Sequence, residues 1–153
     1  MLDICDLICK NSFVFFEENT NKNNVFCKIS KKASILYKVN EHQLLNSLTN
    51  NKKSFFVGNG VVISDVQNKF INHSKAMISV LSKGIEYEST DDIPVDIIVL
   101  LLISETSKLE HIQTLASISR LFRNFELTNK LRGCKNRESA FVIFSQVISN
   151  KAA

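Results

Sequence analysis

The stretch Val95–Ile103 is almost continuously apolar, and Asp96 is its only charged residue. It follows the chain's single proline, Pro94, and consists otherwise of valine, isoleucine and leucine. A helix that spans a membrane needs about 20 apolar residues, so this stretch is too short for that role. A short run of this kind is typical of a strand that is covered on both faces of a sheet. We therefore expect an α/β fold with helices packed on both faces of a central sheet.

Further strands are predicted on the N-terminal side of this stretch, at residues 13–16, 55–63 and 76–81. Gly58 and Gly60 interrupt the second of these, which predicts a bend within one strand. The polar residues 64–74 are predicted to form a loop.

Helices are predicted near both ends of the chain, where apolar residues recur at helical spacing. Their expected ranges are residues 2–8, 25–37, 107–123 and 125–132. Two more helices are expected to begin after Asn40 and Asn136, which are typical N-cap residues. One face of the helix at 107–123 is marked by Leu109, Ile112, Leu115, Ala116, Ser119 and Phe122.

Composition limits the class of protein. The chain has 153 residues, 44% of them hydrophobic and 22% charged, which predicts a single domain over residues 1–153 and excludes a disordered tail. The net charge of +4 is too small to indicate nucleic-acid binding by itself. The acidic start, Met1–Asp6, is unlike a signal peptide and predicts a cytoplasmic protein. The four cysteines stand at no metal-ligand spacing, so no metal is expected, and no cofactor is expected either. In a reducing compartment they should be free thiols, most of them buried.

One motif resembles a known active site. The run from Gly58 to Asp65 reads Gly-Asn-Gly-Val-Val-Ile-Ser-Asp. It resembles the active-site run of the fructose/mannitol-type enzyme IIA proteins of the bacterial phosphotransferase system. In that family the run is glycine, any residue, glycine, valine or isoleucine, alanine, isoleucine or leucine, proline and the phosphoryl-accepting histidine.

Other segments extend the resemblance, in the same order, from about Ile4 to Phe144. They are Lys75–Val80, Gly84-Ile85, Ile93–Asp96, Leu102–Glu105 and His111–Ala116. As a single domain, the chain looks most like the nitrogen-regulatory branch. The resemblance implies a mixed sheet flanked by helices, as in the mannitol-type enzyme IIA sandwich.

The family chemistry follows from the resemblance. A phosphoryl group passes from phosphoenolpyruvate through enzyme I and HPr to the acceptor histidine, whose neutral imidazole is nucleophilic near pH 7. In the nitrogen-regulatory branch, phosphorylation changes the binding of partners. The partners implied are HPr-like phosphotransferase proteins and regulatory targets such as sensor kinases or potassium-transport regulators. Neither nucleic acid nor membrane insertion is expected, and the oligomeric state is left open.

Several active-site positions differ from the family pattern. The acceptor position is Asp65, the preceding proline is Ser64, and the arginine two residues after the acceptor is Gln67. Counting back along the chain, a second arginine and a threonine become Thr49 and Phe55. His111 matches the second family histidine, which assists the phosphoryl group. It reads either as a remnant of the phosphate site or as a half-buried histidine that is hydrogen-bonded locally.

Losing one donor to a developing oxyanion costs roughly 10²–10³ in rate, and losing the nucleophile removes the reaction. We therefore predict that HPr cannot phosphorylate this protein by the family route. Asp65 has three open readings. It is the product of drift, it is a fixed charge that partly mimics a phosphoryl group, or it accepts phosphate itself. The last reaction normally needs magnesium and extra carboxylates. Asp91, Asp92 and Asp96 are available, but nothing in the sequence places them beside Asp65.

The sequence thus predicts a regulatory protein that works by protein–protein contact. Whether it is also an enzyme is left open, because the family is a phosphotransferase component but the acceptor position is Asp65. Its docking surface is expected to surround Gly58, Gly60, Ser64, Asp65, Gln67 and His111. The alternative is an active phosphoryl carrier that uses Asp65 or another residue. The basic segment 120–137 is expected to be a solvated helix face, and the alternative is a docking patch for an acidic partner.

Overall fold

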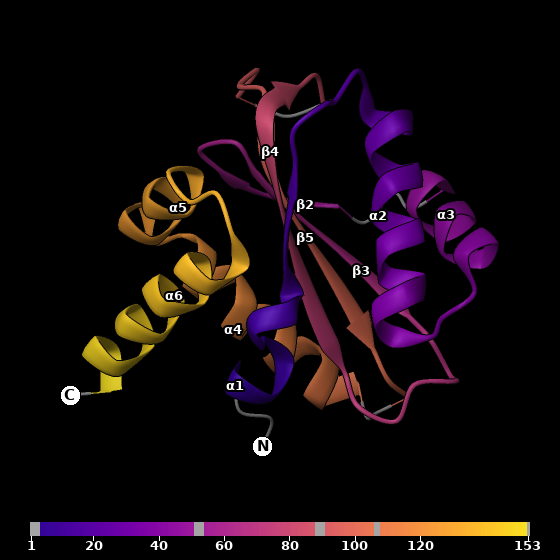
Figure 1. Ribbon diagram of the computed structural model, residues 1–153. Coiled ribbons are helices and arrows are strands. Elements are labelled where there is room, and N and C mark those ends of the chain that lie inside the picture. The colour runs from indigo at the N-terminus through magenta and orange to yellow at the C-terminus, as the bar shows by residue number, and fades with distance from the viewer. Residues whose placement is uncertain (1–3, 51–53, 88–90, 106–107, 153) are drawn as a thin grey trace.

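The computed structural model describes residues 4–50, 54–87, 91–105 and 108–152. The described residues contain five strands, six helices and one short 3-10 helix, joined by turns and loops (Figure 1). In chain order they are α1 (Ile4–Leu7), the 3-10 helix η1 (Lys10–Ser12), β1 (Phe13–Phe16), α2 (Lys22–Tyr37), α3 (Glu41–Asn50), β2 (Phe55–Gly58), β3 (Val61–Gln67), β4 (Lys75–Ile85), β5 (Val95–Ile103), α4 (Lys108–Phe122), α5 (Phe125–Arg132) and α6 (Arg137–Ala152).

The strands form one mixed sheet in the order β1-β4-β5-β3-β2. Strand β5 lies in the centre, antiparallel to β4 and parallel to β3, while β1 is parallel to β4 and β2 is antiparallel to β3. Every residue of β5 except Asp96 is buried. The expected central strand and the mixed α/β sheet are therefore confirmed.

Helices cover both faces of the sheet (Figure 1). Because side chains alternate along a strand, β5 directs Ile97, Val99 and Leu101 to one face and Ile98 and Leu100 to the other. The first face packs against α1, α4, α5 and α6, and the second packs against α2 and α3. No helix in the described parts of the chain has the length and apolarity to cross a membrane.

Asparagine side chains cap four of the helices. Each accepts a hydrogen bond from a backbone N–H in the first turn, which satisfies a group that the helix itself leaves unpaired. The caps are Asn21 for α2, Asn40 for α3, Asn124 for α5 and Asn136 for α6. Asn40 and Asn136 are the helix starts that the sequence predicts.

The hairpin of β2 and β3 differs from the prediction of one bent strand at 55–63. The turn residues Gly58, Asn59 and Gly60 all have positive φ, at 99°, 55° and 79°, and the chain reverses there. An Asn-Gly pair between apolar runs is a strong hairpin signal because both residues tolerate positive φ. The predicted loop at 64–74 is also wrong at its start, since β3 continues to Gln67 and keeps its pairing with β5.

The cysteines differ from expectation as well. Cys5, Cys9 and Cys27 are exposed and Cys134 is half-buried, so the prediction that these thiols are mostly buried is wrong. The apolar faces of α1 and α2 are already filled by larger side chains such as Leu7, Val25 and Phe26.

Candidate functional site

Asp65 and His111 are in direct contact. His111 Nε2 lies 2.8 Å from Asp65 Oδ2, and the exposed fractions of the two side chains are 23% and 9%. Asp65 is on β3, on the same face as Val61 and Ile63, and that face packs against α4. His111 stands in the first turn of α4, directly over this strand. The structure thus brings together two residues that are 46 positions apart in the sequence.

The contact fixes which ring nitrogen carries a proton. A carboxylate only accepts hydrogen bonds, so His111 donates its Nε2–H to Asp65. In a neutral imidazole the other nitrogen, Nδ1, then has a lone pair. Among the described residues, none forms a hydrogen bond with Nδ1. The arrangement resembles the carboxylate–histidine part of a catalytic triad, in which a carboxylate orients a ring and offsets its positive charge.

Gly58 and Gly60 do not join this pair. Gly60 lies beside the start of β5, where its carbonyl accepts hydrogen bonds from the backbone N–H groups of Asp96 and Ile97. Asp65 instead pairs with Leu101, near the other end of β5. At about 3.3 Å per residue, five residues of strand separate the glycine turn from Asp65 by about 16 Å. The two glycines therefore serve the hairpin turn, not a close approach of the backbone to residue 65.

Ser64 lies on the opposite face of the sheet from Asp65. It is 1% exposed, and its Oγ is 3.3 Å from Ser54 Oγ, which is 3.4 Å from Tyr87 Oη. This hydroxyl chain is part of the α2/α3 side. Gln67 is exposed at the end of β3 and borders a hollow of about 310 Å³ with Gln43, Lys69 and Glu105. Gln67 thus lies at the same end of β3 as Asp65, but no hydrogen bond joins it to the Asp65–His111 pair among the described residues.

The exposed face of α4 was misjudged from the sequence. Leu109 and Ile112, on either side of His111, are 64% and 54% exposed, although their spacing suggested a core face. The buried residues of α4 are Thr114, Ile118, Leu121 and Phe122. The apolar pattern of this helix is wider than one buried stripe, so spacing alone could not show which side faces the sheet. Two large apolar side chains near the start of the helix that carries His111 are therefore exposed.

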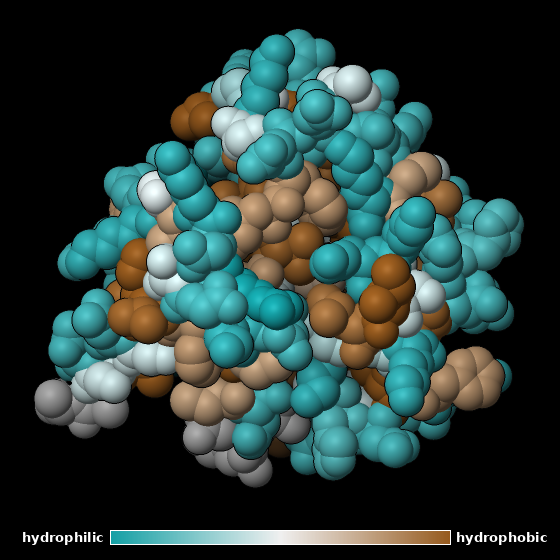
Figure 2. Space-filling view, viewed as in Figure 1, coloured by the Kyte–Doolittle hydropathy of each residue, from teal (hydrophilic) through white to brown (hydrophobic). Residues whose placement is uncertain are grey.

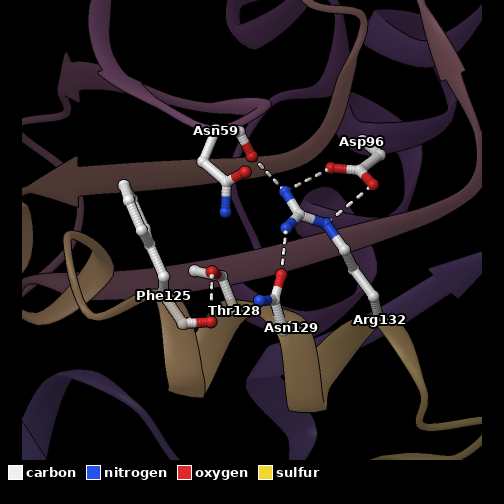
Figure 3. A network of polar contacts seen from close by, with 6 residues as sticks. All are labelled: Asn59, Asp96, Phe125, Thr128, Asn129 and Arg132. Carbon is white, nitrogen blue, oxygen red and sulfur yellow. Dashed lines mark hydrogen bonds and ion pairs between the residues drawn. The ribbon is translucent and has the colours of Figure 1, made fainter.

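A second polar cluster, which the sequence did not indicate, lies at the other end of the sheet (Figure 3). Arg132 on α5 donates through Nε and Nη2 to the two carboxylate oxygens of Asp96, both at 2.8 Å. It also donates to Asn129 Oδ1 at 2.9 Å and to the backbone carbonyl of Asn59. Arg132 belongs to the basic segment that was expected to be a solvated face, and for this residue the expectation is wrong.

This cluster also bears on the carboxylates considered for Asp65. Asp96 is bound to Arg132 beside Gly60, and the exposed Asp91 and Asp92 precede β5 at the same end. All three thus lie at the end of the sheet away from Asp65. In the described ranges no group of three histidine, cysteine or acidic side chains is placed to hold a metal ion.

Solved structures of enzyme IIA proteins share this fold. The nitrogen regulatory protein IIA-Ntr of Neisseria meningitidis superposes with a TM-score of 0.79 at 17% identity, over 92% of this chain and 98% of that one. The mannitol enzyme IIA of Escherichia coli gives 0.71 at 10% identity, over 90% and 98%. The fold is therefore that of an enzyme IIA of the mannitol type.

The sequence comparisons identify the family. Residues 7–147 match the family described as "Phosphoenolpyruvate-dependent sugar phosphotransferase system, EIIA 2". The chain therefore belongs to this family. A relative called "Nitrogen regulatory protein", from Bradyrhizobium diazoefficiens, is 26% identical over 146 residues, covering 94% of this chain and 95% of the relative. Within the family, the chain is similar to the nitrogen-regulatory enzymes IIA.

Proposed function

We propose that this protein is a regulatory, protein-binding enzyme IIA of the nitrogen-regulatory type that does not accept a phosphoryl group at position 65. The observation that carries the proposal is the 2.8 Å contact between Asp65 Oδ2 and His111 Nε2. The position that the resemblance assigns to the acceptor histidine holds a largely covered carboxylate, and the matching second histidine is bound to it. By that resemblance, the pair would stand where the reacting groups of the family stand.

The partners proposed are HPr-like phosphotransferase proteins or regulatory targets such as sensor kinases and potassium-transport regulators. A solved complex of the Escherichia coli mannitol enzyme IIA with its phosphorylated enzyme IIB has a TM-score of 0.72 to this chain at 9% identity. It supports the idea that this fold docks a protein partner. Leu109 and Ile112, on the same helix as His111, are large apolar side chains that a partner could cover.

The geometry bears differently on the three readings of Asp65. A carboxylate that is 9% exposed and bound to a histidine presents little free charge to a partner, which favours drift over a charge mimic. The distance of Asp96 from Asp65 weighs against a magnesium-assisted acyl phosphate. An Asp65→Asn substitution separates the first two readings, because it changes partner affinity only if the charge at this position is recognised.

A second candidate function is an active carrier in which His111 replaces the lost acceptor. The hydrogen bond to Asp65 leaves Nδ1 as the nucleophilic nitrogen, and the carboxylate offsets the charge of a phosphorylated ring. In that reaction a P–N bond forms at Nδ1 while the P–N bond of phosphorylated HPr breaks. The ring proton stays on Nε2 throughout.

One labelling experiment decides between these functions. The protein is mixed with enzyme I, HPr and phosphoenolpyruvate that carries labelled phosphorus, and a family member with the acceptor histidine is the positive control. The regulatory proposal expects no label on this protein. Label that disappears in His111→Gln and persists in Asp65→Asn would establish the carrier instead. Label that is lost only in Asp65→Asn would establish an acyl phosphate.

A further inference from the structure

Helix α2 turns a cationic stripe toward solvent. Its buried side, which includes Val25, Ile29 and Ala33, packs on the sheet. Residues spaced three and four apart on the other side of the helix point away from the sheet. We call the following residues the α2 stripe: Lys28, Lys31, Lys32 and Ile35 on the helix, and Lys38 at its C-cap.

The segment that forms α2 and α3 carries an excess of positive charge. Residues 22–50 contain five lysines and one acid, Glu41, so their formal charge is five minus one, or +4, the same as the net charge of the whole chain. Lys31, Lys32 and Lys38 are exposed. Within the described residues, no ion pair involves a lysine of the stripe. Lys28 is half-buried and donates to the backbone carbonyl of Glu18, so the charges that the stripe presents to one ligand are those of Lys31, Lys32 and Lys38.

An apolar side chain lies in the middle of these charges. Ile35 is 68% exposed, with Lys31 and Lys32 one turn before it and Lys38 one turn after it. In the view of Figure 2, the surface over α2 and α3 is mostly hydrophilic with isolated apolar side chains. Such an arrangement combines electrostatic attraction with one group that gains by leaving water.

We propose that the α2 stripe binds the anionic surface of a lipid bilayer. Each lysine near such a surface is attracted by its negative potential, and Ile35 enters the headgroup region. A protein partner is disfavoured because protein interfaces are enriched in arginine and depleted in lysine. The stripe contains no arginine, and all four arginines lie at or after Arg120. A nucleic acid is disfavoured because the stripe has no aromatic residue on which bases could stack.

The orientation of the bound protein follows from the fold. Helix α2 lies on the opposite face of the sheet from α4, which carries His111 (Figure 1). A bilayer under α2 therefore leaves the Asp65–His111 side open to the aqueous phase. This last consequence rests on the proposed function, but the lipid contact itself does not.

The test is co-sedimentation of the full chain with vesicles. Phosphatidylcholine vesicles that contain phosphatidylglycerol are compared with vesicles of phosphatidylcholine alone, at low and high salt. Binding is expected only to the anionic vesicles, and it should weaken with salt. The double substitution Lys31→Gln with Lys32→Gln should lower the partition coefficient about 30-fold, since each lysine is worth about 1 kcal/mol near such a surface. Adding Ile35→Ser to this double substitution should lower the partition coefficient further, at both low and high salt.

A matched control removes the same charge elsewhere. Lys108→Gln with Lys135→Gln alters two exposed lysines outside the stripe, and it should change the partition coefficient by less than about twofold. The proposal would be overturned by an equal loss in this control or by a lack of binding to anionic vesicles. It would also be overturned if the protein bound polyglutamate or duplex DNA more tightly than it binds vesicles. Because these outcomes do not involve phosphoryl transfer, they are distinguishable from a failure of the proposed function.

Discussion

Arg132 and Asp96 join the end of α5 to the start of β5 through two hydrogen bonds of 2.8 Å each. The same guanidinium also donates to the carbonyl of Asn59 in the turn before β3. One side chain thus holds a helix, the central strand and the hairpin together. Bidentate arginine–carboxylate pairs are among the strongest polar contacts in proteins because both N–H groups align with both oxygens.

Replacing Arg132 with alanine should lower the free energy of unfolding by about 2–3 kcal/mol, since it leaves a partly covered Asp96 and a backbone carbonyl without their donor. Arg132→Lys should recover less than half of the loss, because lysine cannot form the paired bonds. Urea unfolding measures both. Lys130→Ala removes an exposed pair with Glu126 on the same helix and should cost less than about 0.5 kcal/mol. Equal losses at 130 and 132 would contradict the assignment.

The two turn glycines should respond unequally to alanine. A Cβ at Gly60 would lie 3.0 Å from both Asp96 Oδ1 and the Pro94 carbonyl, whereas a Cβ at Gly58 would have no atom within 4 Å. Both positions have positive φ, so Gly58→Ala should cost about 1 kcal/mol from backbone strain alone. Gly60→Ala should cost about 1–2 kcal/mol more, because crowding adds to the strain. Thermal unfolding of the two variants would test the difference, and similar melting temperatures would exclude crowding.

The coupling between Asp65 and His111 can be measured by a double-mutant cycle. The sum of the losses in Asp65→Ala and His111→Ala should exceed the loss in the double variant by about 1–2 kcal/mol, since each single change leaves a partly covered polar group without this partner. Chemical denaturation near neutral pH supplies the three values. Additive losses would show that the two side chains contribute nothing to each other's stability.

Tyr37 predicts a dependence on alkaline pH. Burial raises the pKa of its hydroxyl above the ordinary value of 10.0. The unfolded chain therefore loses this proton before the folded one, and stability should fall as pH rises from about 10 through the higher folded-state pKa. Tyr37→Phe removes this part of the loss, and the difference in unfolding free energy between the two proteins isolates it from the lysines that titrate nearby. A difference that is constant with pH would contradict the prediction.

Regular elements with one strong pattern could be predicted from the sequence. Strand β5 and helix α5 occur within the expected bounds, because the strand is continuously apolar and the helix ends at Gly133. The β2–β3 hairpin was missed because the apolar residues on either side of Asn59 read as one run. In α4 the apolar residues cover too much of the helix for their spacing to show that Leu109 faces solvent.

The candidate site required information beyond local pattern. Asp65 was singled out by its place in a run that resembles an active site, and His111 by its place in a later segment. Nothing in the spacing of these residues shows that 46 positions of chain bring them to 2.8 Å. The pair of Asp96 and Arg132 depends in the same way on how α5 packs against the sheet. It had no motif to draw attention to it.

The alternation along β3 places Ser64 and Asp65, which are adjacent in sequence, in separate compartments of the molecule. Ser64 adjoins a hydroxyl chain under α2 and α3, whereas Asp65 meets α4. The sheet between them acts as a partition, so a substitution at one position is not sensed directly by the helices on the other side. Substitutions on the α2/α3 side can consequently accumulate over evolutionary time without altering the surface on the α4 side, and the reverse also holds.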